Sequence, residues 1–186
     1  DNLTTEYRCF SATTEAMYSQ VRKQRWHNFD LLKHQDMETM VDLIIDSLPD
    51  DATIIRVHVG GDFFNEKYFQ AWTMVARLNP NKIFYAYTKS IPYWINNLDL
   101  IPGNFILNAS YGGRMDNLIV QYNLKSAIVV FSEQQAINNG LEIDHDERHA
   151  IASTKPFALL IHGQQPKDSN ASQAIKEIKR LEKLKV

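Results

Sequence analysis

Residues 56–64 read Arg-Val-His-Val-Gly-Gly-Asp-Phe-Phe. This stretch indicates a strand followed by a glycine-containing loop, the unit from which the fold can be predicted. The run over 53–59 is rich in β-branched residues, which predicts a buried strand. Two glycines and an aspartate, Gly60, Gly61 and Asp62, end that run abruptly. Glycine lets a ligand or a turn approach the backbone closely, so we expect this strand to end at a site where Asp62 holds a ligand.

The same pattern of an apolar run followed by a helical segment continues to the end of the chain. Further strands are expected over 82–88, 104–110, 126–132 and 157–163, and helices over 66–80, 92–97, 114–123, 133–140 and 170–184. Continuous rather than alternating hydrophobicity indicates strands buried on both faces, as in a parallel sheet covered by helices. The sequence therefore predicts an α/β fold made of repeated βα units.

The part of the chain before the first strand is expected to be helical. Residues 13–28 and 34–48 have helical patterns, and Pro49 ends the second. We expect a single domain over 1–186, with an N-terminal helical part (1–50) followed by the βα units (51–186).

Composition places the chain among globular proteins. Hydrophobic residues make up 44% and charged residues 23% of 186 residues. The net charge of −2 gives no overall reason to expect nucleic-acid binding, although a total of this kind leaves room for a local patch. No apolar run approaches the roughly 18 residues of a membrane span. The single cysteine, Cys9, excludes an internal disulfide framework.

Every expected strand is followed by hydrogen-bonding side chains. They are Asp62, Lys89, Asn108 with Ser110 and Arg114, Glu133, and His162. In parallel βα folds the carboxyl ends of the strands and the loops after them form the ligand site. The alternative for each residue alone is a helix cap. Because all five expected strands end in this way, we favour a ligand site over five separate helix caps.

A second group of candidate ligands lies close together in the sequence. Its members are Asp144, His145, Asp146 and His149. The two histidines are four residues apart, so on a helix they would share one face with metal-ligand spacing. The alternative is a solvated loop. His58, in the middle of the first expected strand, is expected to be a hydrogen-bonded core histidine.

Several motifs together resemble the bacteriophage gene product 88 family. They are RVHVGGDFFNEKYFQAW (56–72), FYAYTKS (84–90), NFILNASYGGRMDNLI (104–119), VVFSEQQAINNGLEIDHDERHA (129–150) and FALLIHGQQP (157–166). The family pattern in turn resembles the radical S-adenosylmethionine superfamily. That resemblance implies a partial (β/α)6, TIM-like barrel with a three-cysteine loop after its first strand and a Gly-Gly-Glu motif after its second.

On that pattern Cys9 takes the place of the last cluster cysteine, and the first strand of the barrel would lie upstream of residue 1. The resemblance implies a [4Fe–4S] cluster, S-adenosylmethionine, and radical attack on an unknown substrate in the cytoplasm of the infected host. The implied cofactor-binding residues are Gly60, Gly61, Asp62, Asn108, Ser110 and Arg114, and the residues facing the substrate are Lys89, Glu133 and His162. This chain departs from the pattern in having one cysteine, and Asp in place of Glu.

Two other functions are compatible with the residues. One is a metal-dependent hydrolase or nuclease that uses Asp62 with the histidine and carboxylate group at 144–149. The other is a degenerate barrel that binds a phage or host protein partner, or belongs to the virion. Tyr93 and Trp94 are candidates for its partner surface.

Overall fold

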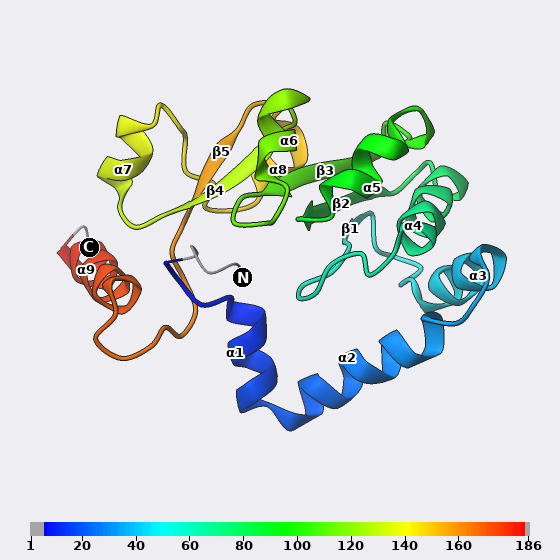
Figure 1. The fold of residues 1–186 in the computed structure, drawn as a ribbon, viewed down its shortest axis with the longest axis horizontal. Helices are drawn as coiled ribbons and strands as arrows, with labels where there is room; N and C mark the ends of the chain where they lie inside the picture. Colours follow the sequence, from blue (N-terminus) through cyan, green and yellow to red (C-terminus); the bar gives the residue numbers. More distant parts are fainter. Residues whose placement is uncertain (1–5, 185–186) are drawn as a thin grey trace.

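The computed structural model describes residues 6–184 and confirms the α/β class (Figure 1). The elements are α1 (Phe10–Met17), α2 (Ser19–Leu32), α3 (Met37–Ser47), β1 (Ile54–Arg56), α4 (Glu66–Leu78), β2 (Ile83–Thr88), α5 (Ile91–Asn96), the 3-10 helix η1 (Leu98–Leu100), β3 (Phe105–Ser110), α6 (Asp116–Gln121), β4 (Ser126–Val130), α7 (Glu133–Asn138), α8 (Arg148–Ala152), β5 (Phe157–Leu160) and α9 (Asn170–Leu184). All neighbouring strands are parallel, in the order β1-β2-β3-β4-β5. This order follows the chain, as in a curled half-barrel of successive βα units.

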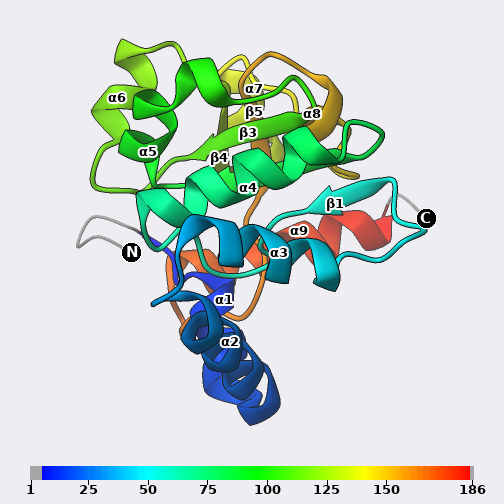
Figure 2. The same cartoon turned by 90° about the vertical axis from the view of Figure 1, so that its right-hand side faces the viewer.

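The main hydrophobic core lies between one face of the sheet and the helices from α3 to α6. Phe69 of α4 and Phe84 of β2 are both fully buried there. Met40 and Ile44 of α3 are buried in the same cluster, and α3 packs beside α4 (Figure 2). The alternation along β2 explains the arrangement, because Phe84 and Ala86 face this core while Tyr85 and Tyr87 face the other side.

The other face of the sheet is partly covered by the short helix α8. Ala150 of this helix is fully buried against Tyr85, Ala127 and Phe157, which come from three different strands. The sheet therefore has helices on both faces, as continuous hydrophobicity along the strands predicts.

Several strands end earlier than the sequence predicts. β1 stops at Arg56 instead of residue 59, because His58 has a φ of 67°, which is incompatible with an extended strand. β5 likewise stops at Leu160, and the helix expected over 13–28 is two helices, since Tyr18 has extended backbone angles.

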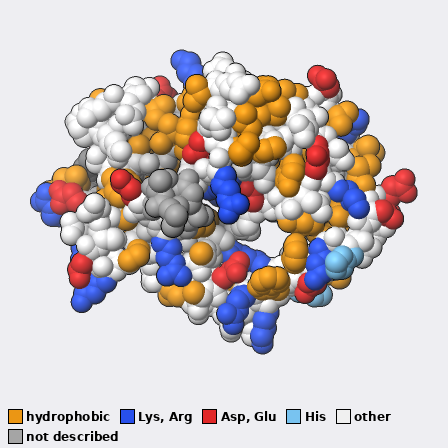
Figure 3. Space-filling view, in the orientation of Figure 1, with side chains coloured by type: hydrophobic (Ala, Val, Ile, Leu, Met, Phe, Trp, Pro, Cys, Tyr) orange, Lys and Arg blue, Asp and Glu red, His pale blue; other side chains and the backbone are white. Residues whose placement is uncertain are grey.

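Helices α1 and α2 form an arch that projects from the rest of the molecule (Figure 2). Not one residue of α2 is buried. The space-filling view shows an opening between this arch and the part of the molecule that contains the sheet (Figure 3). No helix among residues 6–184 combines the length and the hydrophobicity that a membrane span requires.

Removing the buried ring of Phe69 should destabilise the fold. We expect Phe69→Ala to lower the free energy of unfolding by about 3–5 kcal/mol, because the residue is fully buried and leaves a cavity. Leu78→Ala on the same helix is the control, since Leu78 is 57% exposed and should change stability by no more than about 0.5 kcal/mol. Urea unfolding of both variants compares them, and equal losses would contradict the position of the core.

Candidate functional site

The carboxylate of Asp62 joins the loop after β1 to the end of β2. Its Oδ1 accepts hydrogen bonds from the Phe63 amide at 2.8 Å and from the Thr88 hydroxyl at 2.6 Å. Its Oδ2 accepts one from the Lys89 amide at 2.7 Å. A carboxylate has about four acceptor positions, and these three bonds use two on Oδ1 and one on Oδ2. Asp62 therefore stands at the carboxyl edge of the sheet, as predicted, and it also holds that edge together.

Lys89 continues this network from β2 to β3. Its ammonium group donates to the carbonyl oxygens of Ser110 at 3.3 Å and Tyr111 at 2.5 Å. Burial lowers the pKa of Lys89, while the nearby charges of Asp116, Cys9 and Asp62 act in the opposite direction. Lys89 and the backbone of Ser110 thus lie together in this structure, and the ammonium group braces the loop after β3.

Asp116 is a member of this cluster that sequence reasoning missed. Its two carboxylate oxygens accept from the amides of Gly112 at 2.8 Å and Gly113 at 2.9 Å, which closes the turn that follows Tyr111. An aspartate three residues after a glycine pair is a turn and helix-start signal, and this signal could have indicated the residue.

The segment from Tyr7 to Thr13 crosses the carboxyl edge of the sheet. Arg8 exchanges two backbone hydrogen bonds with the side chain of Gln165, which follows β5. The ring of Tyr7 contacts that of Phe131, which follows β4, at 6.3 Å. Burial raises the pKa of Tyr7, and the charges of Cys9 and Asp116 raise it further. The crossing therefore places Cys9 next to the cluster that contains Lys89.

The loop after β1 is covered by the arch. Arg25 of α2 donates to the hydroxyl of Ser11 at 2.7 Å and to the carboxylate of Glu15 at 2.9 Å. A Cβ at Gly60 would overlap the guanidinium group of Arg25. At Gly60 the group that approaches the backbone is therefore the chain's own Arg25, whereas Gly61 has a φ of 99° and open space around it.

The remaining residues expected at strand ends lie in different surroundings. Arg114 and Glu133 are exposed, and Glu133 opens α7. His162 is exposed and lies 5.3 Å, ring to ring, from Phe10. Asn108 is fully buried on the face covered by α8, where its Nδ2 donates to the carbonyl of Ala150 at 3.1 Å. The Asn108 Oδ1 is buried with no hydrogen-bond partner among the described residues.

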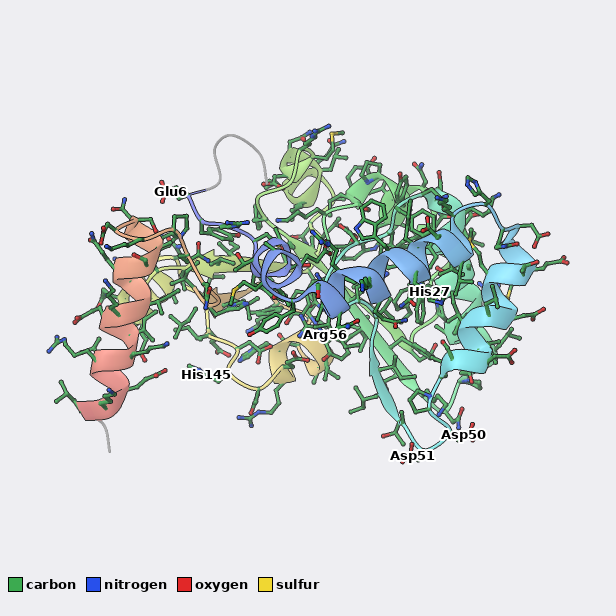
Figure 4. All side chains as sticks on the ribbon, turned by 90° about the horizontal axis from the view of Figure 1, so that it is seen from below. Glu6, His27, Asp50, Asp51, Arg56 and His145 are labelled. Atoms are coloured by element: carbon green, nitrogen blue, oxygen red, sulfur yellow. The ribbon has the colours of Figure 1, made fainter. Side chains whose placement is uncertain are left out.

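The group at 144–149 does not converge on one point. Asp144 accepts from the Ala150 amide, Asp146 pairs with Arg148, and His149 lies 3.5 Å from a carboxylate oxygen of Glu142. Helix α8 begins only at Arg148, so His145 and His149 do not share a helical face. In Figure 4 His145 lies on the side toward α9, apart from Arg56 near the centre. Within residues 6–184 no three His, Cys, Asp or Glu side chains are grouped as metal ligands.

A hollow of about 500 Å³ separates β5 from α9. His145 and His162 both line it, together with apolar residues from the two elements. The sequence analysis places His145 in the candidate metal-binding group and His162 at the end of the last strand, and the structure brings both to this hollow.

His58 is enclosed by aromatic rings, and one of its two ring nitrogens is hydrogen-bonded, as expected for a core histidine. Its ring lies 4.8 Å from Phe63 and 6.3 Å from Trp72, and its Nε2 is 3.1 Å from the hydroxyl of Tyr68. Its Nδ1 is buried with no partner among the described residues. Burial lowers the pKa of His58 to about 4, and the charge of Asp62 opposes this shift only in part.

Acid should therefore destabilise the fold through His58. Between pH 6.5 and pH 4 the unfolded chain binds a proton that the folded chain does not, so stability is complete above 6.5 and is lost as the pH falls. We expect the free energy of unfolding to decrease by about 2 kcal/mol between pH 7.5 and pH 5 from this residue. Urea unfolding at the two pH values measures the difference.

The matched variants are His58→Asn and His27→Asn. Asparagine tolerates the left-handed backbone at position 58 and does not titrate, so the first variant should lose most of the pH dependence. His27 is exposed on α2 (Figure 4) and its replacement should retain that dependence. An unchanged slope in His58→Asn would show that other groups cause the acid sensitivity.

Comparisons with known proteins agree with the sequence motifs. The Gene 88 protein of Mycobacterium phage L5 is 30% identical over 90 residues, which cover 44% of this chain and 38% of that protein. The Gene 88 protein of Mycobacterium phage D29 is 29% identical over the same lengths. No solved structure matches the chain. A family model described as Gene product 88 matches residues 3–180, and the chain therefore belongs to the gene product 88 family.

Proposed function

We propose that this chain forms the barrel part of an enzyme of the radical S-adenosylmethionine type, with its active site at the carboxyl edge of the sheet. The position of Cys9 carries the proposal. It precedes the first residue of α1 and is near enough to Lys89 and Tyr7 for its charge to affect the pKa of both. A thiol at this edge is where the resemblance assigns the last cluster ligand.

The cysteines of the chain can be compared with the ligands that a [4Fe–4S] cluster requires. The resemblance implies three thiolates, and residues 6–184 contain one cysteine. These residues alone therefore do not fit a complete [4Fe–4S] cluster. The proposal gives Cys9 one ligand position and requires two further thiolates. The cluster, when bound, would supply the electron for cleavage of S-adenosylmethionine.

The proposal extends the fold to a partial (β/α)6 barrel. β1 forms one edge of the sheet, and no strand pairs with its outer side within residues 6–184. One additional parallel strand at this edge, preceding the helices in the chain, would complete the six. The sequential order from β1 to β5 supports this extension, because a barrel adds its strands in chain order.

The residues at the edge have separate proposed roles. Asp62 would accept from the ammonium group of the methionine moiety through the remaining position on Oδ2. Arg114, which is exposed after β3, is suited to a carboxylate. Lys89 would position the edge through its bonds to the carbonyls of Ser110 and Tyr111. We assign the activity to the cytoplasm of the phage-infected host and leave the substrate as an unknown small molecule.

Anaerobic iron and sulfide analysis of protein expressed from the complete native reading frame tests the proposal. We expect about four iron and four sulfide per chain, with visible absorption of a [4Fe–4S] cluster. Cys9→Ser should lose most of the iron, because it removes one of the ligands. Ala12→Ser, which introduces the same residue at an exposed position of the same segment, is the control and should retain it. A folded native protein without iron, or one whose iron is unaffected by Cys9→Ser, would contradict the proposal.

A further inference from the structure

The arch of α1 and α2 carries a local positive charge, although the net charge of the whole chain is negative. Residues 10–33, from the start of α1 to the C-cap of α2, contain four Lys and Arg residues and two acidic residues, Glu15 and Asp30, while the whole chain has a net charge of −2. Lys33 pairs with Asp30 and Arg25 pairs with Glu15. Arg22 and Lys23 are exposed, and neither forms a salt bridge within residues 6–184.

An exposed tryptophan lies next to these two cations. Trp26 is 56% exposed, whereas Trp94 is 9% exposed. Arg22 and Trp26 are four residues apart on α2, so they lie on the same side of the helix. An indole left in solvent on a helix without any buried residue is not explained by the packing of this chain.

A hollow of about 220 Å³ adjoins the indole ring. It is lined by Trp26, Phe29, Arg25 and Glu15. The two rings meet at 86° with their centroids 5.8 Å apart, so a planar group stacked on one ring would meet the other at an angle. Arg25 and Glu15, which pair with each other at 2.9 Å, form the charged rim of the hollow. In Figure 3 hydrophobic side chains lie among Lys and Arg side chains, with a few acidic ones, along the arch below the opening.

We propose that the arch binds single-stranded nucleic acid, with one base in the Trp26–Phe29 hollow and the adjacent phosphates on Arg22 and Lys23. Stacking on exposed aromatic rings combined with cations along the backbone is how proteins bind single strands without reading their sequence. A duplex is disfavoured because its bases are already stacked and cannot enter the hollow. The binding does not depend on a cluster, so it stands apart from the enzymatic proposal.

Fluorescence anisotropy with a labelled oligonucleotide of ten thymidines tests this inference on the full chain at low salt. We expect saturable binding that weakens about tenfold in Trp26→Leu, because one stacked base is lost. Arg22→Glu combined with Lys23→Glu should weaken binding further and reduce the dependence of log Kd on log salt by about 1.4, as expected for two phosphate contacts. Circular dichroism should show unchanged folding, since all three side chains are exposed.

The matched control is Lys176→Glu combined with Lys183→Glu, which makes the same charge change at two exposed positions of α9 that do not line the hollow beside β5. It should bind like the unaltered chain. An equal loss in this control, no effect of Trp26→Leu, or no saturable binding would each overturn the proposal. Equal competition by poly-glutamate or by a duplex of the same length would also overturn it, because the arch would then recognise acidic polymers or duplexes without holding a base.

Discussion

The carboxylate of Asp62 is the interaction on which the carboxyl edge of the sheet depends. It accepts from Phe63, Thr88 and Lys89, and so ties the loop after β1 to the end of β2. Thr88 is almost completely buried, so its hydroxyl hydrogen would lose its acceptor if the carboxylate were removed, while its oxygen would still accept from the Ser90 amide. A charged acceptor bonded to two backbone amides also makes stronger hydrogen bonds than a neutral one.

The network reaches further because each member positions the next. The Lys89 amide is held by Asp62, and its ammonium group reaches the carbonyls of Ser110 and Tyr111. Asp116 then closes the Gly112–Gly113 turn that follows. Three successive strand ends are thus connected by hydrogen bonds whose charged groups are partly removed from water. Such an edge is a rigid base for a ligand site, because loops on a fixed sheet can hold side chains precisely enough for binding.

The segment from Tyr7 to Thr13 covers the carboxyl edge of the sheet. Its contacts with Gln165, Phe131 and Gly60 come from loops after β5, β4 and β1, so one short stretch of chain spans the sheet. It carries Cys9 to the charged cluster and begins the arch. The same segment therefore links the edge of the sheet, where Cys9 lies near the charged cluster, to the arch, where Arg22 and Lys23 of α2 are exposed to solvent.

The sequence by itself determined the parallel βα order and the position of Asp62 in the loop that follows the first strand. Burial on both faces produces continuous apolar runs, and a glycine pair indicates the loop after such a run, although β1 itself stops at Arg56, before the glycines. Only the tertiary structure decided that Arg25 fills the space at Gly60 and that His58 lies outside the strand. It also decided that the candidate metal ligands at 144–149 do not converge on one point. It also brought Cys9 beside Lys89, through a segment whose Arg8 bonds to Gln165, 157 residues away. Local patterns report which faces a segment buries. They carry no information about which distant segment will cover a face, because that depends on the folded positions of both.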